Sequence, residues 1–252
     1  MIREIPADFF SDIHGADPFL TRILSLALCY RDDVGFVRYY AQYAGGRAVS
    51  YLSDFDGRMT LFLTADSDIE EIESFVDFLG CVSLMYDERF LSNVNSIKEL
   101  SGDVLQYHTT DEAPLISVEE PPIKEIYEVL QSCASESFSV PDYLSFLSDV
   151  TYRKNRGKCA LCGVREDGAL ASCAVTVAES EDAVILGAVA TRPEYRKRGY
   201  SRAVVKTMGE RFSQERKVYV FSLSEKNTRF YEKSGFVRKY RFIEAFLQQR
   251  KV

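Results

Sequence analysis

One short stretch constrains the fold most. It consists of an apolar run over 183–189, a basic turn with a single glycine, and a helical pattern after it. The apolar run has the length of a buried β-strand. Val204, Met208 and Phe212 then recur every four residues, as they would on one face of an α-helix. We therefore predict a unit of strand, turn and helix, in which the first N–H groups of the helix have no partner within it.

The start of this helix is a predicted anion site. Unpaired N–H groups and the helix dipole give such a helix start partial positive charge. Gly199 lets the backbone approach a ligand closely. Basic side chains add formal charge, and they belong to Arg196, Lys197, Arg198 and Arg202. A ligand rich in phosphate fits this turn, and a diphosphate suits its geometry.

The turn resembles motif A of the GNAT superfamily of acetyl-CoA-dependent N-acyltransferases. The family pattern is Arg or Gln, two residues, Gly, one residue, then Gly or Ala. Arg196, Gly199 and Ser201 hold these positions, and Ser201 is a small departure from the pattern. A second string, Phe-Tyr-Glu-Lys-Ser-Gly-Phe over 230–236, resembles the C-terminal helix and following strand of the family. The two strings occur in the family order, so they point to the family together.

The resemblance implies an α/β (α+β) fold with a mixed, mostly antiparallel sheet flanked by helices. The segment over 111–122 contains three prolines and four acids, which indicates a domain boundary. We predict a smaller N-terminal α/β domain over 1–113 and a GNAT acetyltransferase domain over 114–252. The element order of the first half echoes that of the second. We interpret the first half as a degenerate GNAT-like copy without the basic turn.

Local patterns predict several elements by periodicity and turn chemistry. Asp-Gly between two strand-like runs favours a hairpin, and Ser-x-x-Glu before an apolar helix favours a capping box. The expected elements are helices over 16–31, 33–43 and 142–154, hairpins around Asp56-Gly57 and Asp167-Gly168, a capping box at Ser67 and Glu70, a helix closed by Gly80, and strands over 217–223 and 237–247.

The resemblance also implies the cofactor contacts. The pantetheine arm of acetyl-CoA would enter a gap between the strand that ends at Thr191 and the strand at 217–223, and it would pair with the strand backbone. A backbone N–H near Val189 or Ala190 would stabilise the oxyanion that develops at the thioester. The implied cofactor-binding set is Val189, Ala190, Thr191, Arg196, Lys197, Arg198, Gly199, Tyr200, Ser201, Arg202 and Asn227.

Two further residues have alternative roles. The resemblance implies that Tyr231 protonates the leaving CoA thiolate. The structural alternative is an aromatic side chain that only packs under the C-terminal sheet. Asn227 would contact the CoA arm and would also serve as a helix N-cap. The apolar run 183–186 carries no acid where some family members have a glutamate. The general base therefore remains open between Glu225, another acid and a chain of waters.

Composition narrows the class of protein. The net charge of −7 argues against a surface that binds nucleic acid or an anionic membrane over its whole area. Cys159 and Cys162 lie three apart on a predicted strand and so face opposite sides, which disfavours joint metal binding. We expect six reduced thiols and no metal. The chain shows no signal pattern and no long apolar run, which predicts a cytoplasmic protein.

The leading prediction is an N-acetyltransferase. It would transfer the acetyl group of acetyl-CoA to a small-molecule or peptide amine by direct attack in a ternary complex. The helix over 142–154 would wall the acceptor site, and a homodimer is compatible with the sequence. The main alternative is an acyl-CoA-binding sensor or regulatory module without catalysis. Nucleic-acid binding through the basic turn is a third class, which the net charge disfavours.

Overall fold

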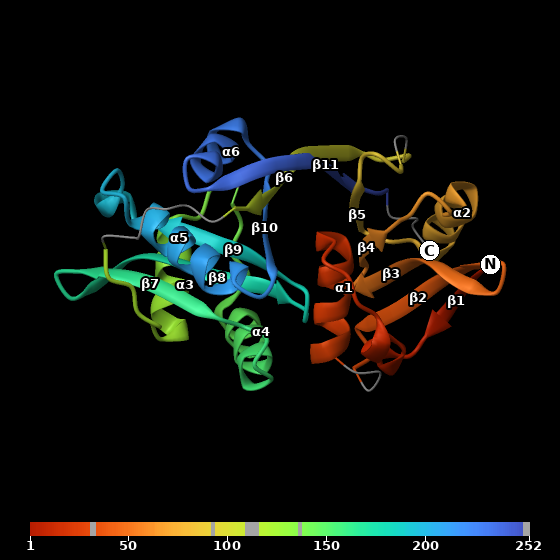
Figure 1. Ribbon diagram of the computed structural model, residues 1–252, viewed down its shortest axis with the longest axis horizontal. Coiled ribbons are helices and arrows are strands. Elements are labelled where there is room, and N and C mark those ends of the chain that lie inside the picture. The colour runs from red at the N-terminus through yellow and green to blue at the C-terminus, as the bar shows by residue number, and fades with distance from the viewer. Residues whose placement is uncertain (31–33, 92–93, 109–115, 136–137, 249–252) are drawn as a thin grey trace. The chain divides into compact units, whose positions relative to one another are not determined.

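The structure is a computed structural model that describes residues 1–30, 34–91, 94–108, 116–135 and 138–248 (Figure 1). Contacts divide the chain into two compact units. Unit 1 contains Met1–Leu105, Phe221–Thr228 and the chain from Arg238 onward, and unit 2 contains Gln106–Val220 and Arg229–Val237. The predicted boundary between 113 and 114 falls in 109–115, outside the described residues.

Unit 1 contains the N-terminal elements and the end of the chain. Its strands follow the order β1-β2-β3-β4-β5-β11-β6. The pair β4 and β5 is parallel, while β1/β2, β2/β3, β3/β4 and β5/β11 are antiparallel. The elements are β1 (Ile2–Ile5), η1 (Ala7–Asp12), α1 (Pro18–Cys29), β2 (Val37–Ala44), β3 (Arg47–Phe55), β4 (Arg58–Phe62), α2 (Ile69–Leu79), β5 (Ser83–Asp87), β6 (Lys98–Tyr107) and β11 (Phe236–Phe246).

The predicted helix over 33–43 is wrong. Val37–Ala44 forms β2, which pairs with β1 on one side and β3 on the other. The segment contains one valine and three tyrosines, and such residues favour strands when neighbouring strands are present to pair with. Pairing with the neighbouring strands therefore determines the conformation of this segment, and the short helical periodicity of its sequence does not predict it.

Both predicted Asp-Gly hairpins are confirmed. Asp56 and Gly57 have φ of 51° and 77°, and Asp167 and Gly168 have φ of 51° and 80°. Positive φ at both central residues is the requirement of the tight turn that matches the twist of paired strands. The sequence pattern therefore fixes these two connections locally.

The capping box predicted at Ser67 and Glu70 is displaced by one residue. Helix α2 begins at Ile69, and the carboxylate of Asp68 accepts a hydrogen bond from the Glu71 N–H at 3.1 Å. The Ser67 hydroxyl instead accepts from the Thr64 N–H at 2.8 Å. The predicted end at Gly80 is confirmed, because this residue has φ of 67° in the left-handed region.

This cap gives a test of stability. Replacing Asp68 with Ala should lower the free energy of unfolding by about 1 kcal/mol, because an exposed N–H at the start of α2 loses its partner. Urea unfolding followed by circular dichroism measures the change. Asp68→Asn, which keeps a side-chain oxygen, should retain most of the stability. If both variants lose the same free energy of unfolding, the negative charge of Asp68 stabilises α2 and its hydrogen bond to the Glu71 N–H does not.

Unit 2 contains the elements that carry the predicted site. Its strands follow the order β10-β9-β8-β7, with β9 and β10 parallel and the other neighbours antiparallel. Helix α5 connects β9 to β10 and packs against β8 and β9 (Figure 1). The elements are α3 (Ile123–Ser132), α4 (Tyr143–Asn155), β7 (Leu161–Glu166), β8 (Ala169–Glu179), β9 (Ala183–Thr191), η2 (Pro193–Tyr195), α5 (Tyr200–Ser213), β10 (Lys217–Ser222) and α6 (Glu225–Glu232). The end of β10 and the first half of α6, which includes Asn227, belong to unit 1.

One core of unit 2 lies between the sheet and helices α3 and α4. Ile126 and Val129 of α3 and Val150 of α4 are at most 1% exposed and pack against Cys173 and Val175 of β8. These apolar side chains recur at helical spacing on α3, which explains why that face is buried. This core therefore supports the part of β9 from which the basic turn begins, since Ala190 of β9 belongs to it.

The C-terminal strand β11 completes the sheet of unit 1. It pairs antiparallel with β5 from Phe242 opposite Asp87 to Phe246 opposite Ser83. The end of the chain thus joins the N-terminal half, although the string over 230–236 precedes it directly in sequence. None of the helices in the described ranges has the length and apolar character needed to cross a membrane.

Candidate functional site

A bulge shapes the end of β9. Cys173 of β8 pairs with Ala190 of β9, while Val175 pairs with Gly187, so β9 has one residue more over this interval. Ala188 has φ of 47°, which is rare for a residue with a side chain. Bulges bend a strand and redirect its backbone groups, and they are common beside active sites.

The edge of β9 that faces β10 is paired for only half its length. The parallel pairing runs from Ala183 opposite Lys217 to Leu186 opposite Val220. Within the described structure, no residue of β9 after Leu186 pairs with β10. The predicted gap for a pantetheine arm requires such an unpaired edge, although the Thr191 carbonyl already accepts from Arg196.

The turn after β9 has the backbone of an anion site. Lys197 has φ of 65° and Gly199 has φ of 86°, and α5 begins at Tyr200. No side chain caps this helix start. A left-handed residue followed by a helical one directs successive N–H groups into one concavity, which attracts anions. The helix dipole adds to this positive potential.

Three hydroxyl groups join the end of β9 to the start of α5. The Ser172 hydroxyl donates to the Ala190 carbonyl at 2.9 Å and lies 2.8 Å from the Thr191 hydroxyl. The Thr191 hydroxyl in turn hydrogen-bonds the hydroxyl of Ser201. Ser201 is the position where the family pattern has Gly or Ala. Its side chain is therefore held against the strand, and the departure from the pattern has a structural reason.

The basic side chains of the turn have different surroundings. Arg196 donates from Nε to the Thr191 carbonyl at 3.2 Å, which turns it back toward β9. Arg198 pairs with Glu166 of β7, with 2.6 Å between Nη1 and Oε1. Lys197 and Arg202 are exposed. The amides of the turn are flanked by positive charge, and Glu166 is the acid that pairs with Arg198.

Tyr231 lies on α6 with its ring packed edge-on against Phe230 and Phe236. Burial raises the pKa of its phenol to about 12. The hydroxyl therefore keeps its proton at neutral pH and can donate a hydrogen bond. A higher pKa also makes the phenol a weaker acid than an exposed tyrosine, which affects the role proposed for it below.

Asn227 is not the N-cap of α6. The helix begins at Glu225, and the Ser224 hydroxyl accepts from the Asn227 N–H at 3.2 Å. Asn227 lies in the first turn and is exposed, so its side chain is not used by the cap. Glu225, one candidate for the general base, lies 3.2 Å from Arg238 in an ion pair.

The cysteines do not form a metal or redox centre in the described structure. All six are free, and no group of three or more His, Cys, Asp and Glu in the described ranges can hold a metal ion. Cys159 packs with α3 and α4. Burial raises the pKa of the Cys162 thiol to about 11, and the charge of nearby Arg211 of α5 opposes this rise. The two thiols of the Cys-x-x-Cys sequence thus face different helices.

Cys173 bears on the predicted direct transfer of the acetyl group to the amine, because a reactive thiol on β8 could form a covalent acyl-enzyme instead. Its side chain is 0% exposed, and burial raises the pKa of the thiol to about 12. A thiol in this state is a poor nucleophile at neutral pH. Cys173→Ala should therefore change the rate of CoA release by no more than about twofold. Loss of turnover in a variant that still binds acetyl-CoA would indicate a covalent acyl-enzyme instead.

Unit 1 repeats the parallel strand-helix-strand unit without the anion site. In β4-α2-β5 the helix start is occupied by the carboxylate of Asp68. Glu70 and Glu71 add negative charge in the first turn, where the corresponding turn of unit 2 is basic. An anionic ligand is repelled by this arrangement, so unit 1 lacks the feature that marks the site in unit 2.

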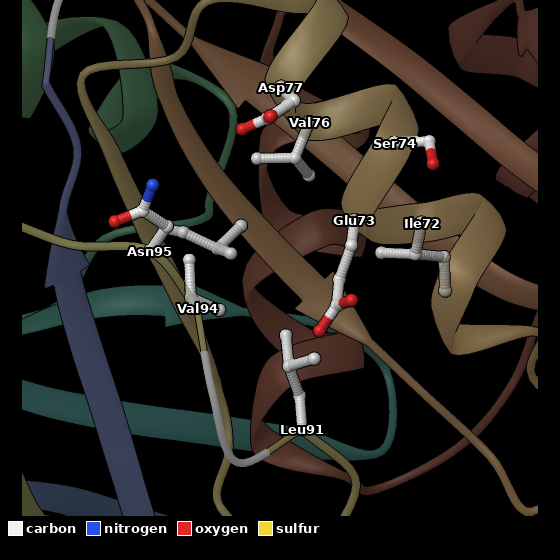
Figure 2. Close-up of a pocket in the computed structure, with 9 residues that line it drawn as sticks. Ile72, Glu73, Ser74, Val76, Asp77, Leu91, Val94 and Asn95 are labelled. Atoms are coloured by element: carbon white, nitrogen blue, oxygen red, sulfur yellow. The ribbon is translucent and has the colours of Figure 1, made fainter.

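Unit 1 has a hollow of about 240 Å³ beside α2 (Figure 2). It contains none of the predicted site residues. Its polar residues are Glu73, Ser74 and Asp77 of α2 and Asn95 (Figure 2). Its apolar side chains come from Ile72, Val76, Leu84, Leu91 and Val94.

Sequence reasoning found the turn but missed three residues that contact it. Glu166 binds Arg198, Ser172 binds Thr191, and Ile116 has its Cδ1 3.8 Å from where a Cβ on Gly199 would lie. Each comes from a different strand or segment, and none stands near the turn in sequence. The alternation of β8 indicates which residues share a face, but it does not identify Ser172 as a partner of Thr191.

Comparison with known proteins agrees with this arrangement. Residues 123–236 match the model of the Acetyltransferase (GNAT) family. A tandem GNAT protein from the clavulanic acid biosynthesis pathway is 14% identical, has a TM-score of 0.62 and covers 100% of both chains. A Drosophila protein is 12% identical with a TM-score of 0.65 and 99% coverage of each chain. A GCN5-related N-acetyltransferase from Sphaerobacter thermophilus is 15% identical with a TM-score of 0.60, over 100% of this chain and 96% of that one.

At these identities the similar structures establish the fold. The predicted α/β fold, with a mostly antiparallel sheet flanked by helices, is confirmed. The match to a tandem GNAT protein extends over both halves, so the fold of the whole chain resembles the fold of that protein. No curated protein matches the chain.

Proposed function

Residues 123–236 form a domain of the GNAT acetyltransferase family, and from this premise we propose that the protein is an N-acetyltransferase. It would transfer the acetyl group of acetyl-CoA to a primary amine of a small molecule or a peptide. We also propose a cytoplasmic location, where the six free thiols would remain reduced.

One observation carries this proposal. The edge of β9 that is unpaired with β10 after Leu186 leads through η2 and the basic turn to the uncapped start of α5 at Tyr200. Acetyl-CoA has an amide-containing arm that can pair with a strand edge and a diphosphate that suits a helix start. The strand edge comes first along the chain and the helix start second. In acetyl-CoA the amide-containing arm likewise comes first, counted from the thioester, and the diphosphate second.

The chemistry would proceed by direct attack. The neutral amine nitrogen bonds to the thioester carbonyl carbon, and negative charge develops on the carbonyl oxygen. The N–H of Val189, next to the bulge at Ala188, would donate to that oxygen, because Ala190, the other candidate, is paired with Cys173 of β8. The carbon–sulfur bond then breaks, the thiolate leaves, and the nitrogen loses its extra proton to a base or to water.

Tyr231 would assist the departure of the sulfur. With a pKa of about 12, its phenol is a weaker acid than a thiol, whose pKa is about 8.5. Complete proton transfer to the thiolate is therefore uphill. We assign Tyr231 the role of a hydrogen-bond donor to the departing sulfur, which stabilises the developing negative charge without giving up its proton.

Two measurements test the proposal in sequence. Isothermal titration calorimetry of the whole chain with acetyl-CoA should show saturable binding. Release of free thiol in the presence of a panel of primary amines should then show turnover that depends on the amine. Absence of acetyl-CoA binding would refute the assignment.

A CoA-binding module without catalysis is the alternative. It is favoured by Ala183–Leu186, the buried start of β9, which carries no carboxylate to accept the proton of the amine. In this case acetyl-CoA would bind with normal affinity, and no amine in the panel would accelerate thiol release. The same pair of measurements therefore separates the two functions.

A further inference from the structure

The carboxylate of Glu166 connects the two residues that flank Gly199. Its Oε1 lies 2.6 Å from Nη1 of Arg198, and its Oε2 accepts a hydrogen bond of 2.5 Å from the Tyr200 hydroxyl. Glu166 is the last residue of β7, so a rigid strand positions it. Its side chain is 24% exposed, compared with 49% for Arg198.

From this geometry we propose that Glu166 is a positioning residue for acetyl-CoA binding, which orders Arg198 and the Gly199 turn before the diphosphate arrives. The inference rests on the proposed function, because it concerns the same anion site. Glu166 itself would not contact the cosubstrate. It would act through Arg198 and Tyr200.

The contacts leave Arg198 able to bind a phosphate. A guanidinium has five N–H donors, and the pair with Glu166 uses one of its nitrogens. The Tyr195 ring lies 5.6 Å from the guanidinium carbon, which further restricts the side chain. Arg198 therefore has a defined orientation with donors to spare.

Ordering in advance favours binding. A free arginine side chain loses rotamer entropy when a ligand fixes it. A carboxylate that fixes it beforehand removes part of this cost from the binding step. The opposing effect is repulsion between Glu166 and the diphosphate. Glu166 is already paired with Arg198 at a site partly open to solvent, and solvent and salt screen this repulsion, so we expect the ordering to dominate.

The test compares Glu166→Ala with the whole wild-type chain. Glu166→Ala should raise the acetyl-CoA Kd and KM about tenfold, with kcat at saturation and the amine KM unchanged. Glu166→Gln, which keeps one acceptor, should give a smaller increase. Glu119→Ala is the matched control, because Glu119 pairs at 2.6 Å with Arg165, the neighbour of Glu166 on β7, and its ion pair in the described structure does not involve the turn. It should leave the acetyl-CoA Kd unchanged.

A double-mutant cycle separates positioning from general stabilisation. If Glu166 acts through Arg198, then Glu166→Ala should weaken binding little further in the Arg198→Ala background. Fully additive losses, unchanged affinity or tighter binding in Glu166→Ala would each overturn the inference. If wild-type protein binds acetyl-CoA and Glu166→Ala binds equally well, only this inference fails. If wild-type protein does not bind acetyl-CoA, the proposed function fails as well.

Discussion

Replacing Gly199 with Ala should weaken acetyl-CoA binding by about 10- to 100-fold, which corresponds to about 1.4–2.7 kcal/mol. The reason is conformational. Gly199 has φ of 86°, and a residue with a side chain is strained there. A Cβ at this position would meet only Ile116 at 3.8 Å, an ordinary contact, so no steric clash accounts for the loss. Relief of the strain would rotate the peptide groups at the start of α5 away from the diphosphate.

Gly157→Ala is the matched control for this variant. Gly157 also lies in unit 2, has φ of 66°, and has open space around the position of a Cβ. It should lower the free energy of unfolding by about 1 kcal/mol, as Gly199→Ala should. Calorimetry should show that only Gly199→Ala changes the acetyl-CoA Kd. Equal affinity in the two variants would exclude the turn as the diphosphate site.

Replacing Tyr231 with Phe should lower kcat by about 10- to 100-fold while the acetyl-CoA Kd changes little. One hydrogen bond to a developing thiolate stabilises the transition state by about 1.5–3 kcal/mol. The estimate is below the upper range for general acids, because the raised pKa of the phenol opposes complete proton transfer. Thiol release at saturating amine and acetyl-CoA measures the effect.

Tyr107→Phe is the control, since Tyr107 packs on Phe236 just as Tyr231 does. Its hydroxyl donates to Glu210 at 2.5 Å, so its loss should affect stability and leave kcat unchanged. If both variants lower kcat equally, packing around Phe236 explains the effect of Tyr231, and the hydrogen-bond role is wrong.

The raised pKa of Tyr231 also predicts a dependence of stability on pH. The unfolded phenol ionises near pH 10, while the folded one resists ionisation until about pH 12. Between these values the folded state binds more protons, so the free energy of unfolding should fall as pH rises above 10. The Tyr231→Phe protein should lose less stability over this interval. Urea unfolding at pH 9 and pH 11 measures the difference.

Local chemistry in the sequence determined the strand, the basic turn and the helix of the site. A buried apolar run, a glycine at the turn and a four-residue repeat each specify backbone structure over a few residues. The same applies to the Asp-Gly hairpins and to the end of α2 at Gly80, all of which the structure confirms. The order of the two family strings then indicated the GNAT fold, which the similar structures confirm.

Tertiary structure decided what depends on residues far apart in the chain. Val37–Ala44 is a strand because β1 and β3 flank it, and β11 belongs to unit 1 because β5 offers it a free edge. The bulge at Ala188 appears only where β8 and β9 are one residue out of register. The contact between Glu166 and Arg198 joins residues 32 apart in sequence. Pairing and side-chain contacts of this kind depend on which surfaces the folded chain brings together, and no local pattern encodes them.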